Sequence, residues 1–254
     1  DVLVEFDRNG SLPTTHESQG SDMGLCGGLL GWDAADGRLP GSPEALRATG
    51  TTFRIETVDS GDPHPNTYRL TLTGGGAQHR LRAISTGGGM VEAVAVDEFP
   101  VSIAGDYYET LLWVERNDPD LLHRLSGLLE ADAILLHESE TGHLVEIKAQ
   151  RFLDDRSVAA LQLLGAIRQV KRLAPVLPVL SRRGVAVPFQ TCDEMLQFDA
   201  GRDTPLWRHA LEYEMARGGL SESEVLAKMG EIVRVLRRSI QHGLAGTAYG
   251  DRLL

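Results

Sequence analysis

Residues 111–129 read LLWVERNDPDLLHRLSGLL and combine the signature of a strand with that of a following helix. The run from Leu111 to Val114 is short and apolar, as in a buried strand. Asp118-Pro119 then supplies a helix N-cap and a residue suited to the first turn. The stretch therefore predicts a strand that leads directly into an amphipathic helix. The apolar stripe of that helix is Leu121, Leu122, Leu125, Leu128 and Leu129.

The residues up to Leu173 repeat this alternation. A turn at Thr141-Gly142 separates two apolar runs, which predicts a β-hairpin. Asp154 has the chemistry of a second helix N-cap. The resulting order is strand, helix, strand, strand, helix, strand, which is that of a ferredoxin-like unit. The expected strands are Leu111–Val114, Ala133–Leu136, Leu144–Ala149 and Val170–Leu173, and the expected second helix carries Val158, Leu161, Leu164 and Ile167.

The residues before this unit predict a small mixed α/β domain. Val2–Phe6 alternates as a strand does, and Asp22–Trp32 is small and apolar enough for a closely packed helix. Ser42-Pro43 is typical of a helix start. Three glycines at residues 74–76 indicate a hairpin connection between two strands. Strands are also expected at Thr51–Val58, Tyr68–Thr73, Arg80–Ser85 and Val91–Val96.

The residues after the ferredoxin-like unit predict helices. Thr204-Pro205 is typical of a helix start, and Ser221 with Glu224 matches a capping box ahead of a long amphipathic helix. Such helices bury little by themselves, so they need a partner surface. We therefore expect an α+β chain with three units, at residues 1–105, 106–180 and 181–254.

Composition and charge narrow the class of protein. The chain has 254 residues and a formal net charge of -11, which opposes a nucleic-acid partner because phosphate backbones require clustered Lys and Arg. No apolar run is long enough for a membrane span, and the first residues lack the pattern of a signal peptide, so a cytosolic protein is expected. The two cysteines, Cys26 and Cys192, are too few for a disulfide framework or for an iron–sulfur cluster held by this chain alone.

A polar but stiff corner is predicted at Pro63-His64-Pro65-Asn66-Thr67. Each proline fixes its own φ and drives the preceding residue towards extended conformations. An imidazole, an amide and a hydroxyl held rigidly suit a small polar ligand. The alternative interpretation is a capped turn that leads into the next strand.

Two further polar stretches are candidates for ligand binding. Ser85-Thr86 precedes three glycines, Gly87, Gly88 and Gly89, whose backbone N–H groups could form a cradle for an anion. The alternative interpretation of those glycines is a bulge between two strands.

The second of these stretches is a dense polar loop at residues 14–22, ahead of an apolar helix. It contains Gln19, Ser21 and Asp22. Its alternative interpretation is a solvated loop in which Ser21 or Asp22 is simply the helix N-cap.

Taken together and in order, these stretches resemble the beta domain of the iron–sulfur-dependent L-serine dehydratases, also called L-serine ammonia-lyases. The resemblance is strongest at residues 64–67 and 85–89. Residues 109–173 look like the ACT domain of that family, a fold often used to sense amino acids. The helices of residues 191–246 look like the opening of its alpha domain, including the run Ile240-Gln241-His242-Gly243-Leu244.

The resemblance implies a lyase that eliminates water and ammonia from L-serine to give pyruvate. In that family a 4Fe-4S cluster polarises the leaving hydroxyl of serine; here its ligands would lie outside this chain, and the isolated segment would be inactive. The implied amino-acid-binding residues are His64, Asn66, Thr67, Ser85, Thr86, Gly87, Gly88, Gly89, Gln19, Ser21 and Asp22.

The resemblance also implies partners and regulation. Asn117 and Asp118 would bind an effector, an alpha-type catalytic domain would complete the enzyme, and a homodimer is expected. The alternative function is a non-catalytic module that binds amino acids or pairs subunits.

Overall fold

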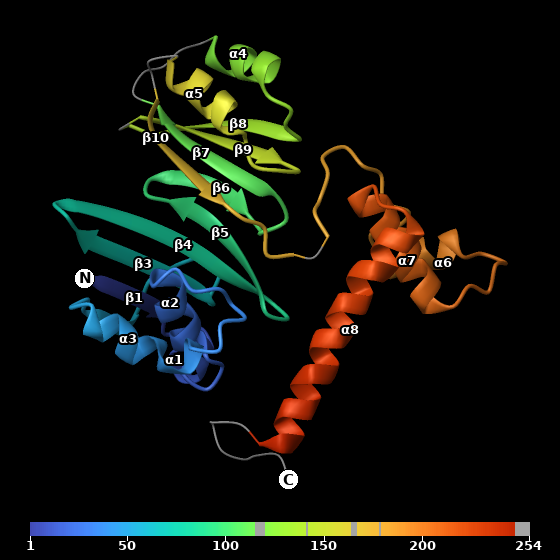
Figure 1. Cartoon of the computed structure of the whole chain (residues 1–254), viewed down its shortest axis with the longest axis horizontal. Helices are drawn as coiled ribbons and strands as arrows, with labels where there is room; N and C mark the ends of the chain where they lie inside the picture. Colours follow the sequence, from blue (N-terminus) through green and yellow to red (C-terminus); the bar gives the residue numbers. More distant parts are fainter. Residues whose placement is uncertain (115–119, 141, 164–166, 178, 247–254) are drawn as a thin grey trace.

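The chain contains two β-sheets and a helical C-terminal part (Figure 1). The structure is a computed structural model that describes residues 1–114, 120–140, 142–163, 167–177 and 179–246. The first sheet has six strands in the order β2-β1-β3-β4-β5-β6, and the second has four in the order β10-β7-β9-β8. The expected α+β class is confirmed.

The first sheet belongs to the first 103 residues. β1 pairs in parallel with β2 and antiparallel with β3, and the remaining pairs are antiparallel. The connection between the parallel strands carries short helices, as such a crossover requires. The strands are β1 (Val2–Asp7), β2 (Phe53–Val58), β3 (Thr67–Gly74), β4 (Ala77–Gly87), β5 (Met90–Val96) and β6 (Phe99–Ile103), and the helices are α1 (Leu12–Thr15), α2 (Ser21–Leu29), η1 (Leu39–Gly41) and α3 (Ser42–Ala48).

The helices cover one face of β1. Leu12 of α1 and Leu25 and Leu29 of α2 belong to the same apolar cluster as Val4 and Phe6, both of which are fully buried. This cluster fixes α1 and α2 beside the carboxyl end of β1. Their position matters because the polar loop of residues 14–22 lies between them.

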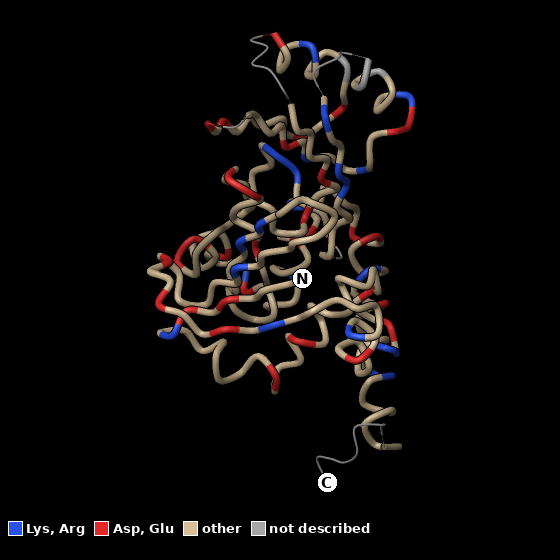
Figure 2. Tube along the Cα trace, turned by 90° about the vertical axis from the view of Figure 1, so that its left-hand side faces the viewer, with Lys and Arg blue, Asp and Glu red and all other residues tan. Residues whose placement is uncertain are grey.

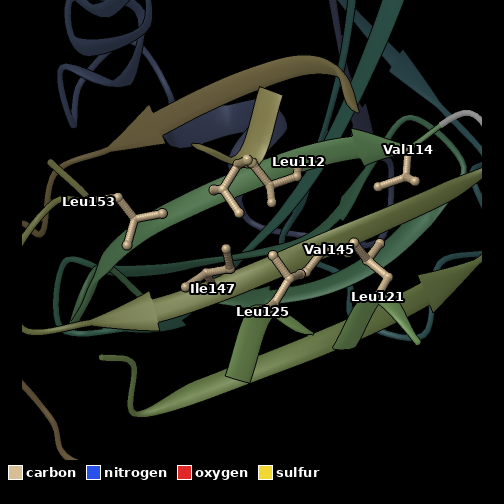
Figure 3. Close-up of a cluster of buried hydrophobic side chains, with 8 residues drawn as sticks. Leu112, Val114, Leu121, Leu125, Val145, Ile147 and Leu153 are labelled. Atoms are coloured by element: carbon tan, nitrogen blue, oxygen red, sulfur yellow. The ribbon is translucent and has the colours of Figure 1, made fainter. Parts of the chain in front are cut away.

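The second sheet has the expected order of a ferredoxin-like unit, with antiparallel neighbours throughout. Leucine, valine and isoleucine side chains of the sheet and of its two helices form its core (Figure 3). The elements are β7 (Tyr108–Val114), α4 (Leu121–Leu128), β8 (Ala133–Glu138), β9 (His143–Ala149), α5 (Asp155–Leu163) and β10 (Ile167–Leu173), and the core residues are Leu112, Val114, Leu121, Leu125, Val145, Ile147, Leu153 and Leu161.

Two local predictions in this unit need correction or lie outside the structure. Ile167 was expected on the second helix but opens β10, where it pairs with Val114. The N-cap of α4 is Asp120. Asp118-Pro119, expected to begin that helix, lies outside the described residues.

The other face of the second sheet contacts the edge of the first. Phe99 and Val101 of β6 form a buried cluster with Leu111 of β7 and Leu144 of β9. The strand β6 was not predicted from the sequence. It is the element that joins the two sheets.

The C-terminal part consists of α6 (Cys192–Phe198), α7 (Leu206–Gly218) and α8 (Glu222–Ala245). The expected capping box of α8 is present, because Ser221 and Glu224 each bond the other's backbone N–H. α6 lies within residues 191–246, where the family resemblance implied helices, although no local pattern singled it out. No helix in the described ranges has the length and apolarity that a membrane crossing needs. Large apolar side chains of α8 remain exposed, namely Leu226, Val233, Val235, Leu236, Ile240 and Leu244.

Candidate functional site

The predicted polar stretches meet at one end of the first sheet. Because β3 runs antiparallel to β1 and β4, its amino end lies beside their carboxyl ends. Phe6 pairs with Tyr68, and Thr67 pairs with Ile84. We call this region the corner, and define it as residues 64–67 together with residues 84–89.

Residues 64–67 form a turn held by its own polar groups. The Thr67 hydroxyl donates to the His64 carbonyl oxygen at 2.6 Å, and the Asn66 N–H donates to His64 Nδ1 at 3.2 Å. Thr67 is 3% exposed, whereas His64 and Asn66 are half-buried. The neutral His64 ring consequently carries its proton on Nε2, because Nδ1 is the acceptor.

The second stretch of the corner touches the first directly. The Ser85 N–H donates to the Asn66 carbonyl oxygen at 2.9 Å. This bond places Ser85 beside the His64 turn. The two stretches that the sequence analysis grouped on resemblance alone are therefore neighbours in space.

The three glycines form the exposed end of the β4–β5 hairpin. Gly87 pairs with Met90, and Gly88 and Gly89 have φ of 61° and 81°, which suit a two-residue turn with positive φ at both positions. The register shifts between Ser85 and Gly87, as at a β-bulge. The bulge that was the alternative interpretation is present next to the glycines, whereas Gly88 and Gly89 themselves form the exposed turn.

The loop that follows β1 packs onto the corner. Asn66 Oδ1 accepts from the Ser11 N–H at 2.8 Å and from the Ser11 hydroxyl at 3.0 Å. A Cβ on Gly10 would lie 2.2 Å from the Pro65 carbonyl oxygen. Only glycine therefore allows the two backbones to approach this closely.

The polar stretch of residues 14–22 contacts β3 beside the corner. The Ser21 hydroxyl lies 3.2 Å from the Tyr68 hydroxyl, next to Thr67. Asp22 instead binds His16 Nδ1 at 2.7 Å, and that imidazole packs on Phe6.

Gln19 lies apart from these contacts. It lines a hollow of about 460 Å³ along α2, together with Met23, Gly24 and Trp32. The N-cap of α2 is Gly20, in the left-handed region, rather than Ser21 or Asp22 as expected.

Charged and polar side chains hold the loop before His64 in place, and no local sequence pattern predicted these contacts. We call Asp7, Ser60, Asp62 and Arg69 the brace. Asp7 at the end of β1 accepts from the Ser60 N–H and hydroxyl, and these bonds with those of Asn9 lower the pKa of Asp7 to about 2. Arg69 of β3 binds Asp62 through Nε at 2.7 Å and Nη2 at 2.9 Å, which lowers the pKa of Asp62. Both anchors precede Pro63 and fix where the His64 turn begins.

The corner presents several hydrogen-bonding groups. It offers backbone N–H groups at an exposed glycine turn, the imidazole of His64 and the hydroxyls of Ser85 and Thr86. Asn117 and Asp118, the expected effector-binding residues, lie outside the described residues. Within the described ranges, no group of three His, Cys, Asp or Glu residues could hold a metal ion.

Two curated proteins resemble the chain. "Probable L-serine dehydratase, beta chain" of Bacillus subtilis (strain 168) is 26% identical over 180 residues, which are 68% of this chain and 80% of the relative. "L-serine dehydratase, beta chain" of Peptoniphilus asaccharolyticus is 31% identical over 111 residues, which are 43% of this chain and 50% of the relative. This chain is similar to two L-serine dehydratase beta chains. No protein-family model matches it.

The relationship to L-serine dehydratase beta chains agrees with the resemblance drawn from the motifs. The chain spans about half the length of the Peptoniphilus relative and most of the Bacillus one. Both relatives are named as one chain of an enzyme with more than one kind of chain, a point that bears on the exposed face of α8.

Proposed function

We propose that this chain is the amino-acid-binding part of an L-serine dehydratase, which eliminates water and ammonia from L-serine to give pyruvate. The observation that carries the proposal is the hydrogen bond from the Ser85 N–H to the Asn66 carbonyl oxygen. It joins the two stretches in which the resemblance to that family is strongest. The names of the two relatives support the same reaction.

The corner suits the two charged ends of an amino acid. The N–H groups of the exposed glycine turn and the Thr86 hydroxyl would donate to the carboxylate. The Ser85 hydroxyl and the turn at Asn66 would contact the other polar groups of the amino acid. His64 Nε2 would donate a hydrogen bond, since its Nδ1 already accepts one from the Asn66 N–H.

The elimination needs a group that this chain does not provide. Hydroxide is a poor leaving group until a Lewis acid takes up its developing charge, and a 4Fe-4S cluster supplies that chemistry in the family. The described residues do not fit such a cluster, because Cys26 is buried beside α3 and Cys192 is exposed at the start of α6. We therefore assign this chain the binding of the amino acid and no step at a metal.

The remaining organisation is part of the same proposal. Residues 1–105 would form the beta-type domain, residues 106–180 an ACT-like regulatory domain, and residues 181–254 the start of an alpha-type domain. The exposed apolar stripe of α8, formed by Leu226, Val233, Leu236, Ile240 and Leu244, would be covered by the rest of that alpha-type region, in the same polypeptide or in a second chain. A homodimer in the cytoplasm completes the proposal.

Two hairpins of the same sheet provide a matched test. Gly88 in the corner has φ 61°, and Gly75 at the opposite end of β4 has φ 59°. Asparagine tolerates this conformation better than other non-glycine residues, so Gly88→Asn and Gly75→Asn strain the backbone equally. Only Gly88→Asn places a side chain at the proposed carboxylate cradle.

The measurement is calorimetric titration of the intact protein, with its alpha-type region, with L-serine. We expect Gly88→Asn to weaken binding at least about tenfold and Gly75→Asn to leave it unchanged. Equal binding by the wild type and Gly88→Asn would contradict the proposed site. Binding of L-serine by the reconstituted wild type without release of pyruvate would favour the non-catalytic module instead.

A further inference from the structure

Three charged side chains are buried where the two sheets meet. Glu109 of β7 is 1% exposed and Glu146 of β9 is 0% exposed. Lys148 of β9 lies between them, with its side chain 13% exposed. We call Glu109, Glu146 and Lys148 the junction triad.

Lys148 connects the second sheet to the first. Its Nζ donates to Glu109 Oε1 at 2.7 Å and to the Ser102 carbonyl oxygen of β6 at 2.6 Å. It also lies 2.8 Å from Glu146 Oε1. One ammonium group thus spans two carboxylates of the ferredoxin-like unit and the backbone of the edge strand of the other sheet.

We infer that the junction triad is a proton-dependent latch that holds the ferredoxin-like unit against β6. The geometry supports a proton on Glu109: Lys148 is shared between two buried carboxylates, and of these Glu146 also contacts His137 Nε2 at 2.7 Å. Glu109 Oε2 has no hydrogen-bond partner among the described residues, so this oxygen gains nothing from being charged. A carboxyl that is buried in this way is more stable in its neutral form.

Electrostatics support the same assignment. Burial, the dominant cause, together with nearby Glu146 and Asp106, raises the pKa of Glu109 to about 7, although Lys148 opposes the change. The pKa of Lys148 is raised by its two carboxylate partners despite its burial. Glu109 is therefore the member of the triad that gains or loses a proton near neutral pH.

The surrounding elements also contribute titratable groups to this position. From β8, His137 Nε2 lies 2.7 Å from Glu146 Oε2. The segment before β7 contributes Asp106 and Tyr107, whose ring lies 5.5 Å from Lys148 Nζ. Other charged groups near the junction are Glu92 of β5, which accepts from the Ser102 hydroxyl, Glu98 between β5 and β6, Asp132 before β8, and the exposed Lys171 of β10, which pairs with Leu111 of β7.

The direction of the pH effect follows from the raised pKa. Separation of the sheets returns Glu109 to water and to its ordinary pKa, so the closed junction binds more protons than the open one. The latch is therefore strongest below the ordinary value of 4.5 and weakens as the pH rises to about 7. Opening of the junction should increase by at most about tenfold for each pH unit in this interval.

Amide hydrogen exchange of β6 tests the latch in the intact protein. After correction for the intrinsic exchange rate, we expect β6 to open at least about tenfold more often at pH 7.5 than at pH 5.5. Glu109→Gln keeps the shape and an acceptor for Lys148 but cannot ionise, so its β6 should open equally at both pH values. Glu56→Gln on the exposed strand β2 is the matched control and should behave as the wild type.

Two outcomes would overturn the latch. One is a β6 that opens equally at both pH values in the wild type, and the other is a pH dependence that survives in Glu109→Gln. Infrared spectroscopy of the wild type provides a test that needs no folded variant. A buried protonated carboxyl should be visible at pH 5.5 and lost by pH 8.5, and its absence at pH 5.5 would contradict the proposal.

Discussion

Gly10 packs so closely against the corner that it leaves no room for a side chain. The Cβ of Gly10→Ala would lie 2.2 Å from the Pro65 carbonyl oxygen and must displace the backbone of the His64 turn. We predict a loss of about 1–3 kcal/mol in the free energy of unfolding, together with weaker binding of L-serine. Urea unfolding and calorimetry would measure the two effects.

The control for this substitution is Gly24→Ala on α2, where a Cβ meets nothing within 4 Å. There the change should raise the free energy of unfolding by about 0.5–1 kcal/mol, because alanine favours helix. A Gly10→Ala protein as stable as Gly24→Ala would show that Gly10 and Pro65 are not in close contact.

The lowered pKa of Asp7 leads to a second prediction: the contribution of the brace to the free energy of unfolding depends on pH. The pKa of Asp7 is lowered from 3.8 to about 2 in the folded chain, so its contribution is present above pH 4 and is lost as the pH falls through 2. The difference in free energy of unfolding between the wild type and Asp7→Asn should therefore shrink between pH 4 and pH 2. Asp59→Asn, at a side chain that is 75% exposed, should show no such trend in the same denaturation series.

At the residue scale, the sequence could predict what is local. The prolines on either side of His64 predict a stiff turn, and the structure has a turn there. The brace could not be predicted in this way, because Asp7 and Ser60 are brought together by the parallel pairing of β1 with β2. The burial of Glu109 could not be predicted from the sequence either, because no local pattern shows that β6 covers that face of β7.

At the scale of single elements, the N-terminus of α8 gives the clearest prediction. Ser221 and Glu224 cap the helix reciprocally. Ser221→Ala should lower the free energy of unfolding of α8 by about 1 kcal/mol and increase hydrogen exchange in its first turn. Ser239→Ala, in the exposed middle of the same helix, should slightly stabilise it. Equal exchange in the two variants would contradict a role for the capping box.

The predicted start or end of an element was wrong where two patterns fit the same residues. Ile167 continues the helical spacing of Val158 and Leu161, yet it begins β10 because pairing with β7 buries it against the same core. The strand β6 is five residues long and contains Pro100, which lowers the strand signal. Its place at the edge of the first sheet explains why proline is tolerated there.

At the scale of the whole molecule, acidic residues outnumber basic ones, with 36 Asp and Glu against 25 Lys and Arg. Lys and Arg lie interspersed with Asp and Glu along the described trace (Figure 2). The net charge of -11 opposes a nucleic-acid partner, because phosphate backbones require clustered Lys and Arg. The exposed apolar side chains of α8 offer a surface that a partner could cover.

The stripe of α8 leads to a prediction about assembly. Leu236 and Ile240 are 57% and 64% exposed, so replacing either with glutamate should change the free energy of unfolding of this chain by less than about 0.5 kcal/mol. If the alpha-type region covers the stripe, Leu236→Glu buries a charge in that interface and should weaken assembly at least tenfold, or about 1.4 kcal/mol. Analytical ultracentrifugation of the variant with a separately produced alpha-type region would measure this.

Ala227→Glu is the control: it adds the same charge to the opposite, exposed side of α8 and should assemble as the wild type does. Assembly that is equally strong in all three proteins would mean that the partner does not contact the stripe.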